Sequence, residues 1–143
     1  MSPVARKRFD LDLFNQCDDP ARAATQSYLM ARGFEVEEHP NRYAQDLIAA
    51  ADGETFLVEC EIKKVWKTYD FPYDSVQLPE RKKKFFDELT LFFIWNNNLE
   101  TAMTFWSDRI KHLEPVEVPN KYMYKDEYFF QIPMDLVEQV DAE

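Results

Sequence analysis

The segment of residues 55–64 constrains the fold of this chain more than any other part of the sequence. Its side chains alternate with a period of two, which is the pattern of a β-strand that packs by one face. One face would carry Phe56, Val58, Cys60 and Ile62, and the other would carry Leu57, Glu59, Glu61 and Lys63. The sequence therefore predicts a strand whose second face presents two carboxylates and an ammonium group.

The remaining patterns predict an α/β arrangement around that strand. A helix is expected from Asp18-Asp19-Pro20 to about Arg32, with Gly33 ending it. Asp52-Gly53 is expected to make a hairpin turn into the strand of residues 55–64. Further strands are expected at residues 34–37, 46–50, 90–95, 101–106 and 127–132.

Two prolines suggest further helices. Pro79-Glu80 is expected to open a second helix after a loop at 66–78, and Pro133 to start a short terminal helix. The continuous apolar run at 90–95 predicts a central strand buried on both faces of the sheet. We therefore expect one domain over residues 1–143, with its core at about 19–106, a C-terminal extension at 107–143 and a mixed central sheet.

The net charge of −10 argues against binding nucleic acid by bulk electrostatics, because phosphate contacts need Lys and Arg. The charge is unevenly distributed. Residues 61–84 carry seven basic and four acidic side chains, a net +3 on an otherwise acidic body. This island could be a phosphate-facing surface or only the solvated face of a helix.

Cysteine usage and hydropathy indicate a cytoplasmic protein without a membrane partner. Cys17 and Cys60 lack metal-site spacing, so free thiols in a reducing compartment are expected. The apolar stretch at 91–95 is too short to span a bilayer, and the basic residues 1–8 precede no apolar segment of a signal peptide.

One constellation suits phosphodiester hydrolysis, which needs oxygen ligands for a hard cation and a positive charge near the attacking water. Glu59, Glu61 and Lys63 share one strand face. Counting outward from the hairpin pairs Asp46 near Glu59. Asp46 and Glu61 could then share one metal ion, with Lys63 beside it.

The acid-x-Lys pattern alone is weak, because about two matches are expected by chance in a chain of this composition. The sequence has two, Glu61-Ile62-Lys63 and Glu80-Arg81-Lys82. The second is expected at a helix start, where its side chains would diverge. Only the first lies on an apolar strand that follows a strand bearing Asp46.

In that context the sequence resembles the PD-(D/E)XK nuclease superfamily, and most of all its small phage and prophage members. The resemblance rests on Asp46, on residues 58–64 (VECEIKK) and on residues 76–82 (VQLPERK), and it extends loosely over about 20–133. It implies a restriction-endonuclease-like αβββαβ core with extra C-terminal strands. It also implies an endonuclease that uses Mg²⁺ (or Mn²⁺) and acts on DNA, with a homodimer left open.

The resemblance also implies roles for individual residues. Asp46 and Glu61 would hold Mg²⁺, Lys63 would assist the attacking water, and Glu59 is an alternative ligand to Glu61. The nucleic-acid contacts would come from Gln77, Arg81, Lys82 and Lys64. The chain departs from the pattern in two places, since no proline precedes Asp46 and the first helix offers Gln26 where some resolvase-like members have a glutamate.

Several alternatives stay open at this point. The charged strand face could simply be solvated, and the basic segment could cap and solvate a helix. The aromatic side chains of the loop could stack on bases or pack over the core as a lid; they are Trp66, Tyr69, Phe71 and Tyr73. The second function that remains is a catalytically inactive nuclease-fold module that binds nucleic acid or protein.

Overall fold

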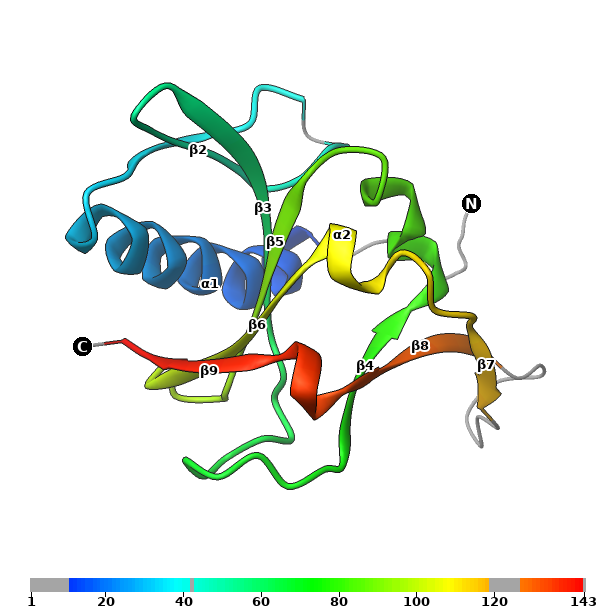
Figure 1. The fold of residues 1–143 in the computed structure, drawn as a ribbon. Coiled ribbons are helices and arrows are strands. Elements are labelled where there is room, and N and C mark those ends of the chain that lie inside the picture. The colour runs from blue at the N-terminus through cyan, green and yellow to red at the C-terminus, as the bar shows by residue number, and fades with distance from the viewer. Residues whose placement is uncertain (1–10, 42, 119–126, 143) are drawn as a thin grey trace.

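Two β-sheets and one long helix make up the described part of the chain (Figure 1). This structure is a computed structural model, and it describes residues 11–41, 43–118 and 127–142. In chain order the elements are α1 (Leu11–Ala31), β1 (Glu35–Glu38), β2 (Leu47–Ala51), β3 (Glu54–Ile62), β4 (Ser75–Pro79), the 3₁₀ helix η1 (Glu80–Phe85), β5 (Thr90–Trp95), β6 (Thr101–Trp106), α2 (Ser107–Ile110), β7 (Val116–Val118), β8 (Glu127–Pro133), the 3₁₀ helix η2 (Met134–Leu136) and β9 (Glu138–Asp141).

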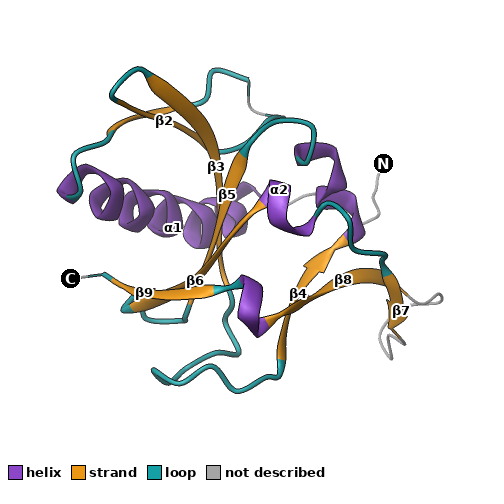
Figure 2. Cartoon of the chain, viewed as in Figure 1, coloured by secondary structure: helices purple, strands orange, loops and turns teal. Residues whose placement is uncertain are grey.

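The main sheet has six strands in the order β1-β2-β3-β5-β6-β9. The β3–β5 pair is parallel and its other pairs are antiparallel, so the predicted mixed central sheet is confirmed. A parallel pair needs a crossover connection. Figure 2 shows that this crossover contains a long loop, β4 and η1. The predicted α/β fold class, with extra C-terminal strands, is therefore confirmed.

The β2–β3 hairpin forms where the sequence predicts it. Asp52 and Gly53 have φ values of 55° and 81°, as a type I′ turn requires at its two central residues. Ala50 lies opposite Thr55, which is the predicted pairing. The last pair of the ladder is Leu47 with Val58, so the preceding residue, Asp46, continues toward Glu59.

Each face of the main sheet packs against its own hydrophobic core. Strand β5 is buried at every position, as predicted, and its side chains alternate between the two cores. The α1 side contains Ala21, Leu29, Leu47, Ala49, Val58, Cys60, Leu91, Phe93, Trp95 and Ala102. The opposite side contains Trp66, Val76, Leu78, Phe85, Phe86, Phe92, Ile94, Met103, Phe105, Ile110, Phe130 and Ile132. The second sheet, β4-β8-β7, therefore covers the face that α1 does not.

The predicted helix after Pro79 is wrong in type, because the segment is a six-residue 3₁₀ helix. Four consecutive basic residues at 81–84 offer no apolar repeat at helical spacing, so only Phe85 and Phe86 pack against the core. The predicted loop at 66–78 also contains a strand. Val76 and Leu78 are buried while Gln77 is exposed, and this alternation allows β4 to pair with β8.

Both ends of the chain differ from the prediction as well. Pro133 is followed by a three-residue 3₁₀ turn and then by β9, which pairs with β6 and covers an otherwise open sheet edge. The first helix begins at Leu11, ahead of the predicted N-cap, with Pro20 inside it. Among the described residues, no helix is long and apolar enough to span a membrane.

Candidate active site

Asp46 lies directly before β2, and its carboxylate reaches the neighbouring strand. Oδ2 accepts a hydrogen bond from the Cys60 backbone N–H at 3.0 Å and lies 3.6 Å from the Cys60 Sγ. Oδ1 lies 3.9 Å from Nη1 of Arg22, which α1 contributes. These contacts hold the carboxylate against the middle of the sequence Glu59-Cys60-Glu61 on β3.

Glu59 is the most perturbed acid of this region. It is 9% exposed, and one of its oxygens accepts a hydrogen bond from the Lys82 ammonium, forming an ion pair. Its other oxygen, Oε1, is buried with no hydrogen-bond partner among the described residues. Burial first, and then the charges of Asp46 and Glu61, raise the pKa of Glu59 to about 7 against the opposing effect of Lys82.

The causes of that shift describe the electrostatics of the site. Asp46 and Glu61 both act on Glu59 through their charge, while the Asp46 carboxylate contacts Cys60 and Arg22 on the α1 side and Glu59 pairs with Lys82 of the crossover. Like charges in a poorly solvated place favour protonation or a bound cation. Carboxylate oxygens are the ligands that Mg²⁺ prefers, and a buried oxygen without a donor is suited to an ion of this kind.

The described residues contain no group of three or more His, Cys, Asp or Glu arranged to hold a metal ion. Mg²⁺ is commonly bound by only one or two carboxylates, with water and substrate phosphate oxygens completing its octahedron. The acidic residues around Asp46 therefore fit a cation that is bound together with its substrate better than a closed structural metal site.

Lys63 continues from the end of β3. Its backbone N–H donates to the Trp95 carbonyl at 2.8 Å, which keeps it aligned with the sheet. Its ammonium lies 5.2 Å from the ring centroid of Tyr73. Lys63, Tyr73 and Gln77 line a hollow of about 300 Å³, together with Asp74 and Ser75. The fold thus brings Lys63 beside Gln77, for which the family resemblance implies a nucleic-acid contact.

The other predicted nucleic-acid residues have different surroundings. Lys64 and Arg81 are exposed on the surface. Lys82 is half-buried and its ammonium is engaged by Glu59, so it is not a free cation in this state. Because η1 is a short 3₁₀ helix, it supplies no long helix dipole at Arg81. Gln26 donates to the Val36 carbonyl at 3.4 Å, which ties it to β1 instead of to the acidic residues.

Two residues beside the site carried no sequence signal. Arg22 is one basic residue of α1 whose proximity to Asp46 depends on how the helix crosses the sheet. Thr25 lies one turn further along, and its hydroxyl donates to the Ala21 carbonyl and accepts a hydrogen bond from the Trp95 indole.

Burial, and then the Asp46 carboxylate, raise the pKa of the Cys60 thiol, so this free cysteine stays protonated.

The aromatic residues of the crossover loop divide into two kinds. Trp66 is fully buried and Phe71 packs against the core. Both therefore pack over the core as a lid and do not stack on bases, which was the other alternative for this loop. Tyr69 is 48% exposed, but its hydroxyl donates to Asp141 at 2.8 Å. Tyr73 is 46% exposed at the hollow beside Lys63.

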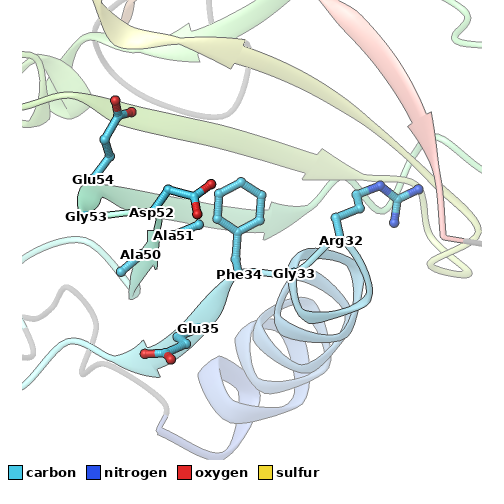
Figure 3. A pocket seen from close by; sticks show the side chains of 9 residues that line it. All are labelled: Arg32, Gly33, Phe34, Glu35, Ala50, Ala51, Asp52, Gly53 and Glu54. Atoms are coloured by element: carbon cyan, nitrogen blue, oxygen red, sulfur yellow. The ribbon is translucent and has the colours of Figure 1, made fainter.

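A larger hollow, of about 690 Å³, lies at the opposite end of the β2–β3 pair (Figure 3). It is formed by residues 32–35 and by the hairpin residues 50–54. Figure 3 shows Arg32 at the opposite side of this hollow from Glu54. Arg32 donates to the Tyr28 carbonyl at 3.1 Å and lies 3.6 Å from the centre of that ring. This hollow is remote from Asp46 and Glu59, so we place the candidate site at the other end.

No family model and no curated protein matches this sequence. Among solved structures, the chain resembles a bacterial homing endonuclease, I-Ssp6803I, with a TM-score of 0.48 and 18% sequence identity. The alignment covers 79% of this chain and 71% of that one. A similarity of this size does not define the activity of the chain, which depends on the side chains of its own site.

Proposed function

We propose that this chain is a metal-dependent endonuclease that hydrolyses phosphodiester bonds of DNA. One observation carries the proposal: the Asp46 carboxylate is hydrogen-bonded to the Cys60 backbone N–H, and Oε1 of the adjacent residue, Glu59, is buried with no hydrogen-bond partner among the described residues. Acids with perturbed pKa values gather at functional sites, and carboxylates are the ligands that hard divalent cations prefer. Lys63, which directly follows the end of β3, adds the positive charge that this chemistry needs.

In the proposed mechanism, Asp46 and Glu61 hold Mg²⁺ or Mn²⁺, and Glu59 is an alternative ligand to Glu61. The cation, when bound, would offset charge on a phosphate oxygen and make water more acidic. Lys63 would orient the attacking water and stabilise the negative charge that develops in the transition state. Arg22 and the Cys60 N–H keep the Asp46 carboxylate in place.

DNA would be bound by local contacts, because the body of the protein is acidic. Lys64 and Arg81 are exposed and can reach phosphates, and Gln77 borders the hollow next to Lys63. Lys82 would contact DNA only if its ion pair with Glu59 were broken. With so few cations, the affinity should depend on salt less steeply than that of a strongly basic DNA-binding protein.

The decisive experiment titrates Mg²⁺ and Mn²⁺ by calorimetry into the wild type, Asp46→Asn and Asp52→Asn. We expect a binding signal in the wild type that is weakened about tenfold or more by Asp46→Asn. Asp52→Asn makes the same chemical change at the exposed hairpin of β2 and should bind the metal as the wild type does. Cleavage of duplex, branched and single-stranded DNA is measured under the same conditions.

Equal metal affinity in the wild type and Asp46→Asn would contradict the assignment of Asp46. A wild type that binds no metal and cleaves none of the three DNA forms would contradict the proposal that the chain is a metal-dependent endonuclease. It would leave the alternative of an inactive nuclease-fold module that acts by binding.

A further inference from the structure

Tyr73 presents an exposed aromatic ring that is nevertheless held firmly. The ring packs edge-on against Phe71, with centroids 5.5 Å apart and planes at 71°. Phe71 packs edge-on against Trp66 at 5.0 Å and 90°. Trp66 is fully buried, and its indole N–H donates to the Asp70 carbonyl at 3.0 Å. A chain of three rings therefore connects the exposed tyrosine to the core.

The hollow beside this ring has a mixed chemistry. Among the described residues that line it, Lys63 is the one cation, and Asp74, Ser75 and Gln77 are the other polar residues beside Tyr73. A single ammonium next to a carboxylate does not suit a row of phosphates. An amide both donates to and accepts from the edges of nucleobases, and a carboxylate accepts from their amino groups. The volume, about 300 Å³, is at the lower end of small-ligand pockets, which suits one planar ring system.

We propose that this hollow binds one unpaired nucleobase, which stacks on Tyr73 while Lys63 contacts an adjacent phosphate. The inference rests on the proposed function and specifies its substrate: DNA with unpaired nucleotides at or next to the cleavage point. A base inside a continuous duplex is stacked on both faces, so it would have to be extruded first. A base in a single strand or at a branch can stack on the tyrosine directly.

The charge of the protein supports this substrate class. A net charge of −10 disfavours wrapping of a duplex, which needs many Lys and Arg contacts along both strands. Stacking contributes binding energy that does not depend on counterion release. The 5.2 Å between the Lys63 ammonium and the Tyr73 centroid brings a phosphate contact and a base contact close enough for one nucleotide.

The test uses oligonucleotides that carry 2-aminopurine, whose fluorescence falls when it stacks on an aromatic side chain. Binding of a single-stranded and a blunt duplex probe is measured in chelator, where no cleavage occurs, with the wild type, Tyr73→Leu and Tyr73→Trp. Tyr128→Leu is the matched control, because Tyr128 is also 46% exposed but lies on β8 of the second sheet. Thermal unfolding of each variant confirms that it is folded.

We expect the wild type to quench the single-stranded probe and to bind it more tightly than the duplex. Tyr73→Leu should abolish the quenching and weaken single-strand binding by about 5- to 150-fold, the range for losing one stacked base. Tyr73→Trp should restore both, and Tyr128→Leu should change neither. Absence of quenching in the wild type, or equal effects of the two leucine variants, would overturn the inference.

Failure of this inference can be told from failure of the proposed function by measuring cleavage in Mg²⁺ or Mn²⁺. A wild type that cleaves DNA but does not quench the probe contradicts only the base site. A wild type that quenches the probe but never cleaves DNA contradicts only the proposed endonuclease activity.

Discussion

The two ends of the β2–β3 pair carry the same kinds of side chain in different environments. The hairpin end bears Asp52 and Glu54, which are both exposed. The other end bears Asp46 and Glu59, which are half-buried and buried and are held by hydrogen bonds and ion pairs. The acidic side chains of the β2–β3 pair therefore form a candidate site only at the end where the fold buries them.

The parallel strand β5 accounts for much of this difference. Leu57 is the first residue of β3 that pairs with β5, so the hairpin extends beyond its neighbour and remains in solvent. From Glu59 onward, β3 is paired with β5 and covered by the crossover that delivers Lys82. Carboxylates in such a place are poorly solvated, and their interactions with one another and with cations are stronger.

The largest effect that this comparison predicts concerns catalysis at the covered end. Lys63→Ala should lower cleavage about a hundredfold or more, the scale for losing one preorganised transition-state contact. Folding should change by only about 0.5 kcal/mol, and metal affinity should hold or rise slightly. Lys67→Ala, an exposed lysine of the following loop, is the control. Rates measured on one DNA substrate check this, and equal rates for the two variants would remove Lys63 from the mechanism.

A smaller effect is expected on stability when the covered ion pair is broken. Lys82→Ala leaves the Glu59 carboxylate buried without its partner. Removing one partner of a buried pair typically destabilises by 3–5 kcal/mol, but Glu59 can be neutralised by a proton near pH 7, so we expect roughly 2 kcal/mol at pH 8. The loss should shrink at pH 5. Urea unfolding checks this against Lys84→Ala, whose lysine is exposed; a similar loss in both variants would mean that the pair contributes nothing specific.

The last effect is a slope of stability with pH, spread over the window between the unfolded and folded pKa values of Glu59. Glu59 keeps its proton up to about pH 7 in the folded protein, whereas the unfolded chain releases it near pH 4.3. Folding therefore takes up a proton between these values. The contribution of Glu59 to the free energy of unfolding falls as the pH rises through this window, by up to about 1.4 kcal/mol per pH unit, and is constant above it.

Glu59→Gln removes this titration and should flatten the slope between pH 4.5 and 7, measured by urea unfolding in chelator. Glu54→Gln makes the same change at the exposed hairpin end of β3 and should retain the wild-type slope. If both variants keep the slope, Glu59 does not titrate in this window. That result would mean that burial does not give Glu59 a pKa different from that of the exposed acids at the hairpin end.

Local patterns were sufficient for much of the sheet. The alternation around Cys60, the apolar run at 90–95 and Asp52-Gly53 predicted β3, β5 and the hairpin, because period and turn chemistry are short-range properties. The same hairpin explains why Asp46 could be predicted to lie near Glu59. Helices were less predictable, and the basic segment after Pro79 became a 3₁₀ turn because it has no face to pack.

Local sequence patterns set which residues alternate on β3 and which turn joins β2 to it. Which charges become neighbours depends on the fold as a whole. The pairing of Lys82 with Glu59, the proximity of Arg22 to Asp46, and the hollow that joins Lys63 to Tyr73 depend on the paths of α1 and of the crossover. Those paths are set by the two hydrophobic cores, which no local pattern encodes, because burial is a property of the whole folded chain.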